Sequence, residues 1–305
     1  MGLLPMPAEG QPLDSAYAIA ARASDFVPVW GRPTRFYDLA EDLSGSWGSV
    51  FVKQLIRDNG MFPLVQMSFI DTGLTLVVPP GLAGATLADP AWREAWLDAA
   101  LSVVRAARPR YLSLGNEVNR WYEKYGAESQ DPNGFQRFVS LYEETRDSVK
   151  ALSPATNVFC IFAREVVSEN RAADMAVLDM FDPARLDLLV LTSYPHALAS
   201  VNRPSDIPDG YYLEAAARMP GKPLGFSEVA WPSDSAFGGE AAQDSFITQL
   251  TGRLTAQQGV DLDLLGWPWL TDLTADDHTG LIRRDGTPKP AWLNWQQLFA
   301  GPSDH

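Results

Sequence analysis

Two glutamates in this chain directly follow strongly apolar stretches, where a carboxylate is unexpected. Glu117 lies in YLSLGNEVN and Glu228 lies in LGFSEVAWPS. A charged side chain beside a buried segment costs free energy unless it is paired or takes part in a reaction. A salt bridge to an arginine would account for either glutamate alone. Two carboxylates in such similar contexts favour one shared site.

A pair of carboxyl groups has the chemistry needed to cleave an acetal, the bond that joins two sugars. The departing oxygen needs a proton, and the anomeric carbon needs negative charge beneath it. Two carboxyl groups roughly 5–5.5 Å apart supply both in a retaining mechanism. Glu117 and Glu228 are candidates for this pair, provided that the fold brings them together.

The elements that must position these carboxylates alternate along the chain. Eight short apolar runs are separated by longer segments of helical period, which is typical of strand–helix units around a parallel sheet. Glu117 and Glu228 fall at the ends of the fourth and seventh runs. We expect the strands at residues 3–7, 26–30, 61–70, 111–118, 157–162, 186–194, 223–229 and 262–269.

Two of the intervening helices have clear boundaries. One begins after Asp89-Pro90, because aspartate caps a helix and proline suits its first turn. The other runs through residues 135–149 and stops before Pro154, which cannot continue a helix. Both have apolar residues at helical spacing, so we expect them to cover the sheet.

These units predict an α/β fold, a closed (β/α)8 TIM barrel that forms one catalytic domain over residues 1–305. An open doubly wound sheet would normally carry a glycine-rich nucleotide turn after its first strand, and the sequence has none. In such barrels the reactive groups lie at the carboxyl ends of the strands, which is where Glu117 and Glu228 fall.

The segments YLSLGNEV and FSEVAWPS resemble those of the retaining glycoside hydrolases of clan A. Barrels of that clan carry an Asn-Glu acid/base on strand four and a glutamate nucleophile on strand seven. The resemblance therefore implies that Glu117 is the acid/base and Glu228 the nucleophile, with no cofactor. Both segments look especially like family 17, the β-1,3-glucanases, whereas GLIRRDGTPKPAW is similar to a pattern found after the eighth strand in several other clan A families.

The resemblance also implies which residues contact the sugar. Asn116 resembles the asparagine that bonds to the sugar 2-hydroxyl. Tyr194 resembles the strand-six tyrosine that donates to the nucleophile, although a tyrosine there could equally line the core. A tryptophan at the end of the last strand usually forms the floor under the reacting sugar. We expect only one of Trp267 and Trp269 to face the mouth of the barrel, and we favour Trp267.

Loops at the same end of the barrel offer further sugar contacts. Sugar rings present C–H faces that stack on aromatic rings, and the candidates are Trp30, Trp121 and Trp231. Arg32 is a candidate for the arginine that many clan A enzymes carry near strand two. Strand three lacks the histidine found in many of them, and the candidates to replace it are Gln66, Ser68 and Asp71.

Composition excludes several other functions. The net charge of −14 would repel nucleic acid and an anionic membrane surface. One cysteine, Cys160, and three histidines make a disulfide or a cysteine or histidine zinc site improbable, so we expect no metal. We find neither a signal-peptide pattern nor an apolar stretch long enough to span a bilayer. The compartment stays open, because a signal could have been removed.

The sequence thus favours a retaining glycoside hydrolase that acts on a β-linked polysaccharide or oligosaccharide. β-1,3-Glucan is the first guess, followed by β-1,4-galactan, β-mannan and xylan. Two alternatives remain: a transglycosylase that uses the same glutamates, and a carbohydrate-binding barrel without turnover. The oligomeric state cannot be predicted.

Overall fold

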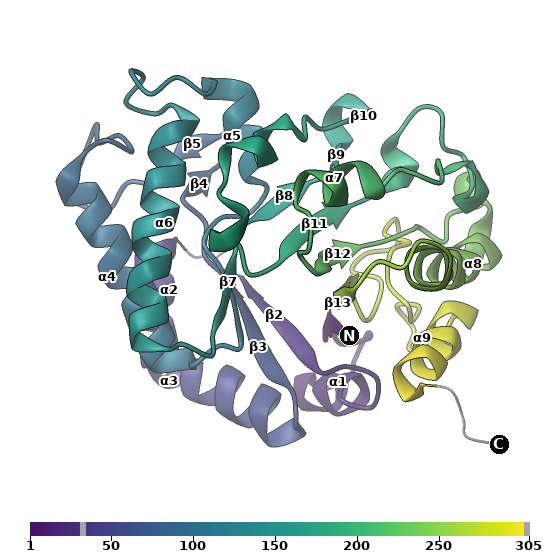
Figure 1. Ribbon diagram of the computed structural model, residues 1–305. Coiled ribbons are helices and arrows are strands. Elements are labelled where there is room, and N and C mark those ends of the chain that lie inside the picture. The colour runs from purple at the N-terminus through teal and green to yellow at the C-terminus, as the bar shows by residue number, and fades with distance from the viewer. Residues whose placement is uncertain (31–34, 302–305) are drawn as a thin grey trace.

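The computed structural model describes residues 1–30 and 35–301 and has the predicted TIM-barrel architecture, with parallel strands inside a ring of helices (Figure 1). The hydrogen-bonded strand order is β7-β6-β3-β2-β1-β13-β12-β11-β8. Only Cys160 separates β7 from β8, so these are two halves of the fifth strand, and the sheet closes through them. The barrel strands are β1 (Gly2–Leu4), β2 (Phe26–Trp30), β3 (Phe62–Gln66), β6 (Tyr111–Ser113), β7 (Asn157–Phe159), β8 (Ile161–Ala163), β11 (Leu189–Ser193), β12 (Leu224–Val229) and β13 (Leu262–Trp269).

Helices cover the outside of the barrel, with α2, α4 and α6 on one side and α8 and α9 on the other (Figure 1). Two π-helical segments, Ser49–Ile56 and Gly252–Gln257, extend α3 and α8. The α-helices are α1 (Leu13–Ala20), α2 (Phe36–Ser44), α3 (Ser46–Gly48), α4 (Pro90–Ala107), α5 (Val118–Tyr125), α6 (Phe135–Leu152), α7 (Leu213–Arg218), α8 (Gly239–Thr251) and α9 (Pro290–Ala300).

Both predicted helix boundaries are confirmed. The carboxylate of Asp89 accepts a hydrogen bond from the Ala91 amide (2.9 Å) at the start of α4, and α6 ends at Leu152. The apolar face of α4 packs through aromatic rings against Phe36 of α2 and Phe69 after β3. Trp92 and Trp96 are fully buried, with ring centroids 5.9 Å apart.

The third and fourth strands end earlier than their apolar runs predict. After β3, the Ser68 hydroxyl accepts a hydrogen bond from the Ile70 amide (3.1 Å), and the chain turns into a hairpin of β4 (Ile70–Asp71) and β5 (Thr75–Leu76). After β6, Val118 already begins α5. A second hairpin, of β9 (Glu165–Val166) and β10 (Arg171–Ala172), follows the fifth strand. These short elements bring polar side chains to the carboxyl end of the barrel.

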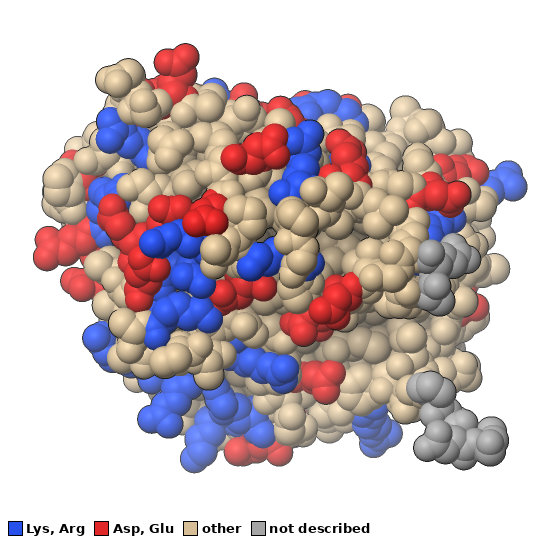
Figure 2. Space-filling model, in the orientation of Figure 1, with Lys and Arg blue, Asp and Glu red and all other residues tan. Residues whose placement is uncertain are grey.

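The surface carries charges of both signs. Figure 2 shows acidic side chains lying among the basic ones on the face in view. No helix in the described part of the chain is both long and apolar enough to cross a membrane.

Candidate active site

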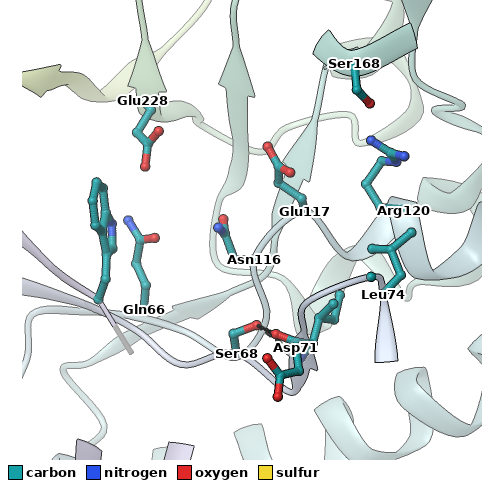
Figure 3. A pocket seen from close by; sticks show the side chains of 12 residues that line it. Gln66, Ser68, Asp71, Leu74, Asn116, Glu117, Arg120, Ser168 and Glu228 are labelled. Atoms are coloured by element: carbon teal, nitrogen blue, oxygen red, sulfur yellow. Dashed lines mark hydrogen bonds between the residues drawn. The ribbon is translucent and has the colours of Figure 1, made fainter. Parts of the chain in front are cut away.

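A pocket of about 580 Å³ opens at the carboxyl ends of the barrel strands. This volume falls within the range of roughly 300–1,000 Å³ that is typical of small-molecule sites. Glu117 and Glu228 both line it, and Figure 3 shows their carboxyl groups pointing into the same space. Among residues 1–30 and 35–301 neither glutamate forms a salt bridge. The lining residues are Trp30, Gln66, Ser68, Ile70, Asp71, Gly73, Leu74, Asn116, Glu117, Arg120, Ser168 and Glu228.

Glu117 lies at the junction between β6 and α5 and has an unusual backbone. Its φ of 51° and ψ of 44° are left-handed, a conformation that costs a residue with a side chain roughly 1–3 kcal/mol. Two contacts hold this junction. Thr192 on β11 donates a hydrogen bond to Glu117 Oε1 (2.8 Å), and Asn119 bonds to both the amide and the carbonyl of Ala163 (2.8 Å each).

Glu228 lies near the end of β12 and accepts a hydrogen bond from the Tyr194 hydroxyl at Oε2 (2.5 Å). This contact is the one that the resemblance implied for Tyr194. Burial raises the pKa of Glu228 to about 7, the Tyr194 hydrogen bond opposes that rise, and the negative charge of Glu117 adds to it.

Several buried polar atoms at the pocket have no hydrogen-bond partner among the described residues. They are Gln66 Oε1 and Nε2, Asn116 Oδ1 and Trp30 Nε1. Leaving such an atom unpaired costs about 1–3 kcal/mol. Gln66 is only 3% exposed, and both atoms of its amide are unpaired. A ligand rich in hydroxyl groups, which both donate and accept, would satisfy this set.

An aromatic ring from the second strand lines the pocket, and a ring from the eighth strand packs against it. Trp30 lines the pocket at the end of β2. Trp269, half-buried at the end of β13, packs edge-on against it with ring centroids 5.6 Å apart. The Trp30 ring lies where a sugar could stack, and Trp269 supports it from the side.

The structure corrects the preference for Trp267 over Trp269. Trp267 is 1% exposed, and its ring packs toward the helices, against Phe246 of α8 and Trp295 of α9. Residues two apart normally face the same side of a strand. A register shift against β1 makes Pro268 an extra residue, so that Trp267 and Trp269 diverge.

Two other predicted sugar contacts also lie in the core. Trp121 and Trp231 are fully buried, and their indole N–H groups donate to the carbonyls of Asn133 (2.7 Å) and Phe237 (3.0 Å). The structure therefore places neither ring at the pocket. Arg32 lies outside the described residues.

Sequence reasoning missed several residues at or beside this site. Thr192 and Asn119 hold the Glu117 junction, while Arg120 and Ser168 line the pocket. Arg120 follows Glu117 at helical spacing, which could have indicated it. The described residues include no group of three or more histidine, cysteine, aspartate or glutamate side chains arranged to hold a metal ion.

No family model and no curated protein matches this sequence. Solved glycoside hydrolase structures do match its fold. A GH5_18 protein from Streptomyces cattleya, in complex with GlcNAc, has a TM-score of 0.63 and 15% identity over 97% of this chain and 78% of its own. An exo-β-1,4-mannosidase from Opitutaceae bacterium strain TAV5 has a TM-score of 0.65 and 14% identity over 94% of this chain and 55% of its own. A family 39 glycoside hydrolase from Bacteroides cellulosilyticus WH2 has a TM-score of 0.65 and 15% identity over 98% of this chain and 63% of its own.

The likeness is one of fold. It establishes that the chain has the TIM-barrel fold of these glycoside hydrolases, as the resemblance to clan A implied. It gives no specific support to family 17.

Proposed function

We propose that this protein is a retaining β-glycosidase that cleaves a β-linked polysaccharide or oligosaccharide. The observation that carries the proposal is that Glu117 and Glu228, from the fourth and seventh strands, line one pocket without any salt bridge among the described residues. The hydrogen bond from Tyr194 to Glu228 supports it, as does the side-chain amide of Gln66, which has no partner in the described part of the chain.

In the proposed reaction, ionised Glu228 attacks the anomeric carbon while Glu117 protonates the departing oxygen. This step breaks the glycosidic bond and forms an ester between the sugar and Glu228. Glu117 then takes a proton from water, which attacks the same carbon and releases the sugar with its original configuration. Tyr194 keeps Glu228 oriented, and Asn116 bonds a sugar hydroxyl close to the reacting carbon. The chemistry needs no cofactor.

β-1,3-Glucan is our first candidate substrate, because of the resemblance of the glutamate segments to family 17. Because the fold is similar to that of an exo-β-1,4-mannosidase, β-mannan is a further candidate substrate, together with β-1,4-galactan and xylan. Trp30, Trp269 and Gln66 supply stacking and hydrogen bonds that suit any of these neutral sugars.

Incubation of the purified protein with these four polysaccharides tests the proposal, with release of reducing ends as the readout. We expect one substrate class to be cleaved, and no cleavage by Glu117→Gln or Glu228→Gln protein. Products longer than the substrate would indicate transglycosylation. Saturable binding without products would indicate a binding barrel and would overturn the proposal.

A further inference from the structure

A third glutamate lies buried behind the pocket and takes no part in the proposed reaction. Glu165 begins β9, directly after the fifth strand, and is 4% exposed. Its Oε1 accepts hydrogen bonds from the Ser193 hydroxyl (3.0 Å) and the Tyr211 hydroxyl (2.7 Å). Its Oε2 accepts one from the backbone amide of Tyr194 (2.7 Å). All three donors thus converge on one enclosed carboxyl.

The surroundings of Glu165 are also polar. Arg164 bonds the Tyr211 carbonyl (2.9 Å) and the Glu214 carboxylate (2.8 Å), and it lies 3.9 Å from the centre of the Tyr211 ring. The Tyr212 hydroxyl bonds the Ser193 hydroxyl (2.9 Å). Burial raises the pKa of Glu165 to about 7, while the hydrogen bonds and the charge of Arg164 oppose the rise.

Three consecutive residues at the end of β11 connect this carboxyl to the pocket. Thr192 donates to Glu117, Ser193 donates to Glu165, and Tyr194 donates to Glu228. The alternation of side chains along a strand explains the pattern, because Thr192 and Tyr194 extend on the side of the two pocket glutamates, while Ser193 extends on the opposite side toward Glu165. Tyr194 is held at both ends, by Glu165 at its backbone amide and by Glu228 at its hydroxyl.

We propose that Glu165 is a positioning residue, which anchors the end of β11 so that the Tyr194 hydroxyl stays in hydrogen-bond contact with Glu228. It touches neither the substrate nor the reacting atoms and acts through Tyr194. The expected effect on catalysis rests on the proposed function, whereas the expected effect on the pKa of Glu228 does not.

The direction of the expected effect follows from the Tyr194 hydrogen bond, which lowers the pKa of Glu228. Among residues 1–30 and 35–301, the titratable groups that act on the pKa of Glu228 are Tyr194 and Glu117. A variant that lets the end of β11 move weakens the Tyr194 contact, so the pKa of Glu228 rises. Glu165→Asp shortens the side chain by one methylene, which moves its carboxylate away from the Tyr194 amide. Glu165→Met removes the carboxylate. Glu165→Gln keeps one oxygen for the Tyr194 amide and serves as the conservative variant.

The test follows the titration of Glu228 by NMR of protein with carbon-13 in its glutamate carboxyl groups. Comparison with Glu228→Gln assigns the signal, and no substrate is needed. We expect Tyr194→Phe to raise the midpoint by about one pH unit and Glu165→Asp to raise it in the same direction. Glu165→Gln should stay close to the original protein. Tyr211→Phe, which removes a different hydrogen bond from the same carboxyl, is the matched control and should not move the midpoint.

A double variant separates positioning from a general loss of stability. Because Glu165 acts through Tyr194, Glu165→Asp combined with Tyr194→Phe should shift the midpoint no further than Tyr194→Phe alone. Additive shifts, or an unmoved midpoint in Glu165→Asp, would overturn the proposal. If the Glu165→Met protein does not fold, the Glu165→Asp protein alone still tests the proposal. If no glycan is cleaved, the proposed function fails while this titration still gives its answer.

Discussion

At the scale of single residues, Glu228 is the side chain whose charge matters most. Glu228→Gln keeps the volume of the side chain but cannot form the ester with the sugar. We expect the rate on an activated aryl β-glycoside to fall about 10⁴-fold or more, as for the loss of one member of a cooperating catalytic unit. Initial rates measure it, with the exposed Glu94→Gln on α4 as the control. Retention of a tenth of the original activity would rule out Glu228 as the nucleophile.

The same substitution should stabilise the protein at alkaline pH. The pKa of Glu228 rises from 4.5 to about 7 in the folded state, so folding strengthens the binding of this proton. That contribution is fully present below pH 4.5 and is lost as the pH rises through about 7. An amide mimics the protonated carboxyl at any pH. Because the pocket admits solvent, we expect a gain of about 1–2 kcal/mol in the free energy of unfolding, below the roughly 3 kcal/mol that the full shift implies.

Urea unfolding at about pH 8.5 and about pH 5 measures this difference. The gain should appear at the higher pH and shrink at the lower one. Glu165 is present in both proteins, so its own titration cancels in the comparison. An equal gain at both pH values would show that the raised pKa of Glu228 is not its source.

Azide distinguishes the roles of the two glutamates. With a dinitrophenyl glycoside, which needs little protonation, Glu117→Ala should still form the ester at Glu228 but hydrolyse it slowly. Azide needs no deprotonation, so it should restore turnover and give a β-glycosyl azide. In Glu228→Ala, azide should enter from the vacated side and give the α-product. The opposite pair of products would exchange the two roles.

At the scale of elements, the arrangement of β6 and β12 fixes the stereochemistry. Their carboxylates face one pocket, so attack by one and protonation by the other should proceed through two inversions. Proton NMR in the first minutes of hydrolysis should show the β-anomer released from a β-linked substrate. Initial appearance of the α-anomer would mean a single inversion, and Glu117 and Glu228 would not work as the proposed pair.

The same elements show what could be predicted from the sequence. Apolar runs that end in a carboxylate indicate burial and position together, so Glu117 and Glu228 could be predicted along with the barrel. The contact of Tyr194 with Glu228 was implied by the resemblance alone. The directions in which the rings of Trp267 and Trp269 point could not be predicted from the sequence, because they depend on the extra residue Pro268 in β13. Thr192 looks like any strand residue, and its partner Glu117 lies 75 positions away.

At the scale of the whole molecule, the net charge of −14 should act on charged substrates alone. The described pocket lining is also acidic, because it contains Asp71, Glu117 and Glu228 but only one basic residue, Arg120. On a neutral glycan that the protein accepts, kcat/KM should change less than about twofold between about 10 mM and about 300 mM salt. On the same glycan after carboxymethylation, kcat/KM should start lower and rise with salt. A carboxymethylated glycan cleaved equally well at low salt would show that this charge does not reach the substrate.

The left-handed backbone at Glu117 sets what a selection experiment would find there. Glycine adopts this conformation without strain, and asparagine does so more readily than glutamate. A library screened for heat tolerance alone should therefore enrich glycine or asparagine at position 117, because either relieves strain at the start of α5. The same proteins would lack the carboxyl group needed for turnover. Alternating rounds of selection for heat tolerance and for glycan cleavage would therefore favour different residues at position 117.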